Sequence, residues 1–195
     1  MKPAHRERAS EAEYLECERQ SEFKHEYVNG EIIAMAGASP RHNLIVANLL
    51  RALGNALLGR PCLVFASDQR VHIAPTRLYA YPDVSVVCGQ PEFHPQSPAT
   101  LQNPLVLFEV LSDATESYDR GAKFAHYRKL EALTEYVLVS QRERRVEHYR
   151  RMESGQWLLT VVEESGTLAL PALLVEVALD EVYLRVETLP AEEPG

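Results

Sequence analysis

Two acidic residues of this sequence stand in or beside apolar segments that are typical of strands. Glu109 lies within the apolar run of residues 105–111, and Asp83 comes directly before the apolar run of residues 84–87. A buried carboxylate is costly unless it is paired, protonated or bound to a metal. Because adjacent strands lie only about 4.8 Å apart, two carboxylates at matching heights could share one divalent ion. Oxygen ligands of this kind favour Mg²⁺ or Mn²⁺.

A basic partner for these carboxylates is expected shortly after the second of them. Lys123 follows Glu109 in a segment with helical spacing, and Asp119 lies one turn earlier on the same face. Three simpler interpretations stay open. Asp83 could merely begin a strand after a proline, Glu109 could form a buried ion pair with Lys123 or Arg128, and Lys123 could form a surface pair with Asp119.

The charge distribution points to a possible partner. The net charge of −8 argues against nucleic acid, but the segment Arg120–Arg151 contains nine Lys or Arg against four Glu. A basic strip within an acidic protein can still follow a phosphate backbone. Arg144, Arg145 and Arg151 are the candidate phosphate contacts, and a solvated charged face is the alternative.

Composition excludes several other classes of protein. A length of 195 residues with 46% hydrophobic and 25% charged residues is typical of one globular domain. No apolar run approaches the roughly 20 residues of a membrane helix, and the polar N-terminus lacks a signal-peptide core, so we expect a cytoplasmic protein. Three cysteines without a CxxC motif favour reduced, mostly buried thiols over disulfides or zinc.

The elements that must position these residues can be read from periodicity and punctuation. Ser10 and Glu13 form a capping box before a short helix, and Asn29-Gly30 marks a β-hairpin. Ser39-Pro40 begins a helix of about 18 residues that ends before Gly59. These elements define the N-terminal part of the domain.

Strands and one further helix follow. Apolar or alternating runs predict strands, and a helix is expected over residues 115–130. We expect residues 91–104 to form a proline-rich loop and the tail from residue 187 to be disordered. The predicted strands cover residues 62–65, 70–73, 84–87, 105–111, 135–139, 145–150 and 157–162. An α/β fold follows, with a mixed sheet flanked by helices, in a single domain over residues 10–186 after a flexible segment of residues 1–9.

At this point the sequence resembles a known family. Its successive motifs EYLE, EYVNGE, SPRH, YPDVSVV, FEVLS, YDRGAKFAHYRK, EYVLVS and RRVEHYR are, in this order, similar to the Uma2-type endonuclease family (DUF820) of the PD-(D/E)XK nuclease superfamily. The resemblance covers about residues 10 to 185. It implies a restriction-endonuclease-like fold, with an N-terminal hairpin and extra C-terminal strands, and Mg²⁺-dependent hydrolysis of phosphodiester bonds.

The resemblance also implies roles for particular residues. Pro82-Asp83 corresponds to the PD motif and Glu109 to the second acidic residue. The superfamily pattern places a lysine two residues after that acid, where this sequence has Leu111, and the resemblance assigns the role to Lys123 in the following helix. Asp83 and Glu109 are then the metal ligands, and Lys123 orients or deprotonates a water.

Three further residues are less clearly assigned. Glu26 is a third candidate ligand, although Glu31 across the same turn could serve instead. His42 opens the long helix as a structural side chain or as a contact to the scissile phosphate, and Asp68 belongs to a turn.

The sequence therefore predicts a metal-dependent endonuclease acting on DNA, and we expect a homodimer because cutting a duplex calls for two active sites. One alternative is a nuclease-like fold that serves as a binding or assembly module without catalysis. Another is a hydrolase of small phosphoesters, which would not need an extended basic strip.

Overall fold

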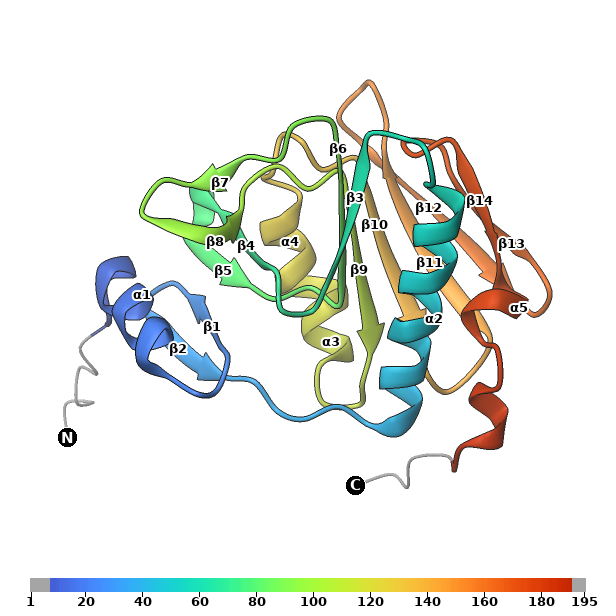
Figure 1. The fold of residues 1–195 in the computed structure, drawn as a ribbon, viewed down its shortest axis with the longest axis horizontal. Coiled ribbons are helices and arrows are strands. Elements are labelled where there is room, and N and C mark those ends of the chain that lie inside the picture. The colour runs from blue at the N-terminus through green and yellow to red at the C-terminus, as the bar shows by residue number, and fades with distance from the viewer. Residues whose placement is uncertain (1–7, 191–195) are drawn as a thin grey trace.

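The computed structural model describes residues 8–190 (Figure 1). Among these residues the strands form two six-stranded sheets and one two-stranded sheet. The sheet that carries the site, here called the central sheet, is mixed, with β9 and β10 parallel and the other neighbours antiparallel. Its strands in spatial order are β12 (Trp157–Glu163), β11 (Arg145–Arg151), β10 (Glu135–Ser140), β9 (Val106–Leu111), β6 (Val84–Cys88) and β3 (Cys62–Ala66).

A second sheet, here called the N-terminal sheet, begins with the predicted hairpin. Asn29 and Gly30 both have positive φ angles, which a two-residue hairpin turn of this type requires. The helix α1 (Glu11–Gln20) precedes the hairpin and has the predicted capping box between Ser10 and Glu13. The strands in spatial order are β2 (Glu31–Ala34), β1 (His25–Val28), β5 (Leu78–Ala80), β4 (Arg70–Ile73), β8 (Ser97–Leu101) and β7 (Phe93–His94).

The helix α2 (Pro40–Ala56) covers one face of the central sheet (Figure 1). As predicted, Pro40 opens it, and the Ser39 hydroxyl accepts a hydrogen bond from the His42 backbone N–H. Its apolar stripe packs on the side chains that the central strands direct toward this face. A continuous core therefore lies between the helix and the sheet. That core contains Ile45, Leu49, Leu53, Val84, Val86, Val106, Phe108, Val137 and Val139.

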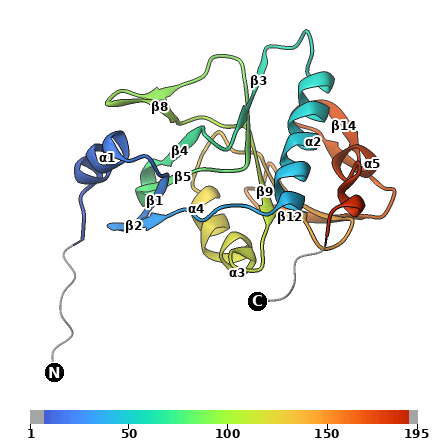
Figure 2. The same ribbon diagram turned by 60° about the horizontal axis from the view of Figure 1, so that its bottom comes forward.

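The opposite face of the central sheet meets the helical segment of residues 116–127, which lies between the two sheets (Figures 1 and 2). This segment consists of α3 (Glu116–Tyr118), a π-helical turn (Asp119–Lys123) and α4 (Phe124–Tyr127). The second core therefore joins the two sheets through this helix. It contains Val71, Ile73, Leu78, Leu101, Leu107, Leu111, Phe124, Tyr127, Tyr136 and Leu138.

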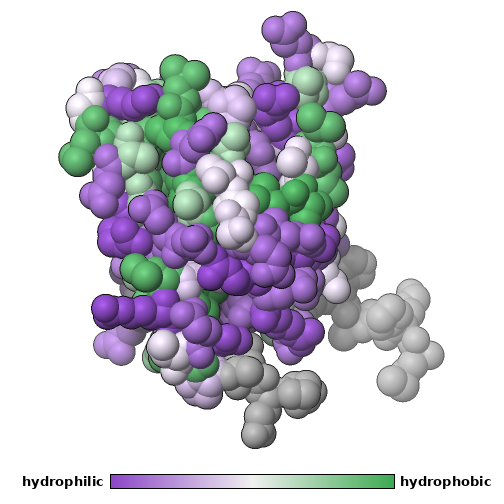
Figure 3. All heavy atoms as spheres, turned by 90° about the vertical axis from the view of Figure 1, so that its right-hand side faces the viewer, coloured by the Kyte–Doolittle hydropathy of each residue, from purple (hydrophilic) through white to green (hydrophobic). Residues whose placement is uncertain are grey.

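The C-terminal residues add a small unit beside the central sheet. It consists of β13 (Thr167–Leu170), β14 (Val175–Ala178) and α5 (Leu179–Val182). In Figure 3 this side of the molecule faces the viewer, and hydrophobic surface gathers in its upper half above a hydrophilic lower half. Two short 3₁₀ turns complete the elements, η1 (Ala74–Thr76) and η3 (Val186–Thr188).

Most predicted elements are confirmed within a residue or two, and three expectations need correction. The expected loop of residues 91–104 contains two short strands, β7 and β8. A proline between them, at 95, and another within β8, at 98, obscured the pattern. The expected helix of residues 115–130 ends at Tyr127 and contains the π turn. The predicted disordered tail of residues 187–195 begins with the last two residues of η3. Most of the rest of it, like most of the predicted flexible segment 1–9, lies outside the described residues.

The cysteine prediction is wrong for two of the three thiols. Cys62 and Cys88 are directly opposite each other on β3 and β6, and they form a disulfide. Cys17 is free but exposed, not buried. The disulfide could not be predicted from the sequence, because the two cysteines are 26 residues apart and meet only through strand pairing. No helix within residues 8–190 is long and apolar enough to cross a membrane.

Candidate active site

Asp83 and Glu109 lie side by side at one end of the β6–β9 pair. The register of these antiparallel strands matches Val84 with Phe108, and its extension by one residue places Asp83 opposite Glu109. Side chains of directly opposed residues share a face and lie about 5 Å apart at Cβ. The two residues are therefore at matching heights on the two neighbouring strands.

Asp83 is oriented by two hydrogen bonds to the same oxygen. Its Oδ2 accepts a bond of 2.7 Å from the Val110 backbone N–H and lies 3.1 Å from Nε2 of His42. Its side chain is 14% exposed, so the carboxylate is held at the rim of the site. His42, at the start of α2, thus contacts an acidic member of the site, and its contact with a phosphate stays a prediction.

Glu109 is buried and paired, which explains how a carboxylate is tolerated in a strand whose residues are all buried. Its Oε1 accepts a hydrogen bond of 2.8 Å from the Tyr127 hydroxyl and lies 2.9 Å from Nζ of Lys123. Burial raises the pKa of Glu109 well above its ordinary value, Lys123 opposes that rise, and the carboxylates of Asp119, Asp83 and Glu26 add to it.

Lys123 stands among three carboxylates. Besides Glu109, its Nζ lies 3.3 Å from Oε1 of Glu26 and 3.5 Å from Oδ1 of Asp119. Burial by itself favours the neutral amine, but Glu109 and the other anionic neighbours outweigh it and raise the pKa of Lys123 well above its ordinary value. Lys123 is therefore a cation at neutral pH, suited to stabilising negative charge more than to accepting a proton.

The structure distinguishes the two glutamates of the hairpin. Glu26 on β1 is buried, faces Lys123, and accepts a hydrogen bond of 3.2 Å from the Tyr81 backbone N–H. Glu31, at the start of β2, is exposed. Of the two candidates, only Glu26 belongs to the cluster of Asp83, Glu109 and Lys123.

The π turn brings Asp119 and Lys123 to the same side of the helical segment. Both residues, at its two ends, are buried, whereas Gly121 and Ala122 between them face solvent. The Tyr136 hydroxyl donates a hydrogen bond of 3.1 Å to the Asp119 carbonyl. Single π turns inside helices occur frequently at functional sites.

The carboxylates of Asp83 and Glu109 fit a hard divalent cation such as Mg²⁺. Two adjacent carboxylates, Asp83 and Glu109, match the way Mg²⁺ is bound through one or two carboxylates, with water and phosphate oxygens completing its shell. Among residues 8–190 no group of three or more His, Cys, Asp or Glu side chains could hold a metal ion. The residues therefore fit a cation shared with a substrate and do not form an all-protein cage.

The three predicted phosphate-binding arginines are engaged with other groups of the chain. Arg144 pairs with Asp180, and Arg145 lies 2.6 Å from Glu163. Arg151 donates hydrogen bonds to the backbone carbonyls of residues 128, 130 and 131. Their contact with nucleic acid stays a prediction.

Two further residues of the site were not assigned roles from the sequence. Tyr127 donates to Glu109, and burial followed by the charge of Glu109 raises the pKa of Tyr127, so its phenol stays a donor. Asp119 forms part of the anionic surroundings of Lys123. Their spacing from Lys123, four residues on each side, was the available signal.

The comparisons with known proteins agree with the fold and with the resemblance of the motifs. Residues 11–185 match the Uma2 family, described as "Putative restriction endonuclease". Two uncharacterized proteins of Synechocystis sp. are similar to the chain along most of their length. For sll1609 the identity is 43% over 76% of this chain and 84% of that protein, and for slr1290 it is 36% over 89% and 90%. The chain belongs to the Uma2 family.

A solved structure shows the same fold. The crystal structure of a "putative nuclease belonging to DUF820" from Anabaena variabilis superposes with a TM-score of 0.73, over 90% of this chain and 97% of that one, at 18% identity. The architecture is therefore the restriction-endonuclease-like α/β fold that the sequence predicted.

Proposed function

We propose that this protein is a divalent-metal-dependent endonuclease that hydrolyses phosphodiester bonds in nucleic acid, with DNA as the expected substrate. One observation carries the proposal: Asp83 and Glu109 lie opposite each other across β6 and β9, with the ammonium of Lys123 2.9 Å from Glu109. The description of the Uma2 family and that of the Anabaena protein support it.

Asp83 and Glu109 would hold the cation, Mg²⁺ or Mn²⁺, and Glu26 is the third acidic residue within reach of the cluster. When bound, such an ion supplies positive charge to a phosphate oxygen and lowers the pKa of a coordinated water. The Val110 N–H and His42 keep Asp83 in one orientation. Tyr127 does the same for Glu109.

Lys123 would orient the attacking water and stabilise the charge that develops on the phosphate. A preorganised cation in a buried site is well suited to this role, because no reorganisation is needed when the charge forms. Its raised pKa argues against the alternative role of general base.

The first test is cleavage of supercoiled plasmid and of single-stranded DNA in Mg²⁺ or Mn²⁺. Asp83→Asn and Lys123→Met should each lower the cleavage rate by roughly 10²-fold or more. Asp68→Asn and Lys129→Met are the matched controls, because Asp68 belongs to a turn and Lys129 is exposed at the helix end. Full activity in either site variant would remove that residue from the mechanism.

A second candidate function is a nuclease-like module that binds or assembles without catalysis. The observation in its favour is that Lys123 is already neutralised by Glu109, Glu26 and Asp119. Mg²⁺ or Mn²⁺ should raise the melting temperature of the wild type but not of Asp83→Asn if the metal site is real. Equal shifts in both, together with no cleavage, would favour the module.

We further propose that residues 10–186 act as one domain, because the cluster draws residues from both large sheets. On duplex DNA we expect a homodimer, since two strands require two sites. Sedimentation of the protein with and without a duplex tests that expectation, and a monomer that cuts both strands would contradict it.

A further inference from the structure

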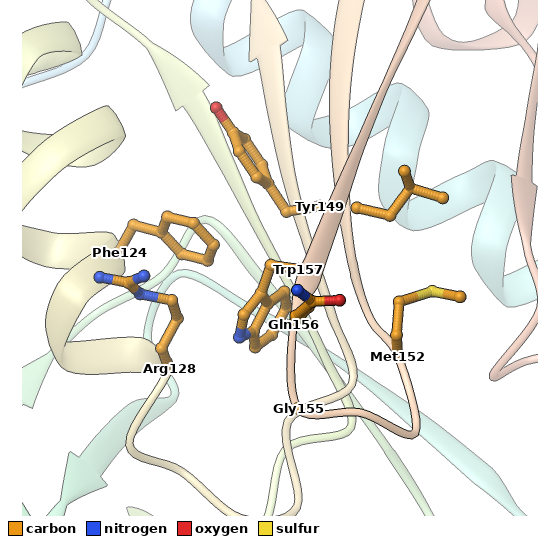
Figure 4. Close-up of a pocket in the computed structure, with 8 residues that line it drawn as sticks. Phe124, Arg128, Tyr149, Met152, Gly155, Gln156 and Trp157 are labelled. Atoms are coloured by element: carbon orange, nitrogen blue, oxygen red, sulfur yellow. The ribbon is translucent and has the colours of Figure 1, made fainter.

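A hollow lined by aromatic side chains lies between the end of the helical segment and the outer strands of the central sheet. Its volume is about 750 Å³, and Figure 4 shows Phe124 and Arg128 extending from the helix on one side and Tyr149 and Trp157 from the strands on the other. Met152 and Leu158 complete its rim, and both are exposed. We call this hollow the aromatic groove.

The rings of the groove are arranged as an open aromatic surface. The ring of Phe124 lies 4.6 Å from that of Tyr149 and 5.2 Å from that of Trp157, measured between centroids. Phe124 is buried, but Tyr149 and Trp157 are only partly buried. Tyr149 and Trp157 therefore pack against the core and also border the hollow.

Cationic groups accompany these rings. The guanidinium of Arg128 lies 5.1 Å from the Phe124 centroid, and that of Arg151 lies 4.9 Å from the Trp157 centroid. Arg128 is exposed and pairs with no carboxylate in the part of the chain that the structure describes. The Tyr149 hydroxyl donates a hydrogen bond of 3.3 Å to Glu147, which is also paired with Arg120.

The groove lies close to the candidate active site and on the same face of the central sheet. Phe124 directly follows Lys123 and belongs to the same core cluster as Leu107. Leu107 and Glu109 are two residues apart on β9, so their side chains lie on the same face of the sheet. Tyr149 is two strands across from Glu109 and two residues along, because Glu109 aligns with Leu138 and Leu138 with Glu147. Strand geometry then separates Glu109 from Tyr149 by roughly 12 Å. Trp157 is one strand further across and four residues along from the position that aligns with Glu109, which gives roughly 20 Å.

From these observations we propose that the aromatic groove binds an unpaired base of a single-stranded nucleic acid, a few nucleotides from the scissile phosphate. Aromatic rings stack on the faces of bases without regard to sequence, and arginine adds a cation–π contact and charge for the phosphates. A base held inside a duplex cannot offer its face to Trp157. The inference rests on the proposed nuclease function and adds to it a preference for single strands or unpaired segments.

The test is a binding titration in EDTA, where no cleavage occurs, with labelled oligodeoxythymidylate and with a duplex of equal length. Trp157 is the only tryptophan of the chain, so its fluorescence reports on the groove directly. We expect the single strand to quench this emission with the same Kd that anisotropy gives. The duplex should leave the emission unchanged.

Variants separate stacking from charge. Trp157→Leu should weaken binding of the single strand by roughly 5- to 100-fold, whereas Trp157→Phe should stay within about twofold, because only the latter keeps a ring. Arg128→Gln should weaken binding and flatten its salt dependence, and Lys129→Gln, with the same loss of charge on a neighbouring exposed residue, should change it less.

The groove and the nuclease proposal can fail separately. Single-stranded DNA that binds tightly with unchanged Trp157 emission, or equal Kd values for Trp157→Leu and wild type, would overturn the groove while cleavage by the Asp83 site stands. Failure of the wild type to bind the single strand would also overturn the groove. Absence of metal-dependent cleavage would instead overturn the nuclease proposal, whatever the fluorescence shows.

Discussion

At the scale of single residues, the site is an ion cluster in which one lysine contacts three carboxylates. Lys123 lies within 3.5 Å of Glu109, Glu26 and Asp119. The ion pair that the sequence left open for Glu109 is thus present, with Lys123 and not Arg128 as the partner. An ion pair and a catalytic role do not exclude each other, because the same ammonium can neutralise Glu109 at rest and stabilise phosphate charge during reaction.

Replacement of Lys123 should therefore cost stability as well as activity. We expect Lys123→Met to lower the free energy of unfolding by about 3–5 kcal/mol, because it leaves buried carboxylates without their cation. Urea denaturation at neutral pH measures this loss. Lys129→Met should stay within about 0.5 kcal/mol.

Comparison with the control variant tests the structural role of Lys123. If Lys123→Met and Lys129→Met were equally stable, the cluster would not hold the core together, and any loss of cleavage in Lys123→Met would then be purely catalytic.

At the scale of elements, the π turn decides which residues reach the site. A regular helix was predicted for residues 115–130 because the apolar spacing of Phe124, Tyr127 and Leu130 is helical. That pattern carries no signal for one extra residue in a turn, so the π turn could not be predicted. A tertiary contact supports it, since the Tyr136 hydroxyl bonds the Asp119 carbonyl. Within the turn, Asp119 also pairs with Lys123.

Gly121 within this turn offers a test of its rigidity. It faces solvent, and a Cβ added there would meet nothing within 4 Å. Gly121→Ala should raise the free energy of unfolding by about 0.5–1 kcal/mol, because alanine loses less chain entropy on folding. Thermal and urea denaturation measure the change, and cleavage should be unaffected. A loss of stability would mean that the turn needs the conformational freedom of glycine.

The predicted strands show where sequence reasoning works. Runs such as residues 84–87 and 105–111 are buried on both faces, and their apolar composition makes them easy to recognise. The short strands β7 and β8 have mixed composition, and β8 contains a proline. Among the described strands, β7 lies at the sheet edge and pairs only with β8, and β8 joins the sheet by pairing with β4, which is distant in the chain. The sequence likewise identified Asp83 and Glu109 by their apolar surroundings, but the contacts of Tyr127 and His42 depend on packing between elements.

At the scale of the whole molecule, the Cys62–Cys88 disulfide joins the edge strand β3 to β6, the strand that begins after Asp83. A bridge with a sequence separation of 26 residues constrains the unfolded chain. The chain-entropy relation for a loop of this length gives about 3–4 kcal/mol.

Reduction should therefore lower the stability of the protein. We expect dithiothreitol, or Cys88→Ser, to lower the free energy of unfolding by up to about 3–4 kcal/mol. Cys17→Ser is the matched control and should have no effect, because Cys17 is an exposed free thiol. Identical denaturation curves with and without reductant would show that the bridge does not contribute to stability in solution.

The position of Glu26 has a consequence for how the chain folds. The cluster joins Glu26, near the start of the chain, with Asp83, Glu109 and Lys123. Tyr81, 55 positions after Glu26, and Lys123 make the connecting contacts. Contacts between residues this distant in sequence form late in folding, because the entropy cost of closing the loop must be offset before they form. The central sheet can condense around local pairings such as β10 with β11 while the lysine still lacks one of its anions. We therefore expect the cluster to form in the last kinetic phase of refolding. Partly folded chains would then lack the complete cluster until the two sheets pack against each other.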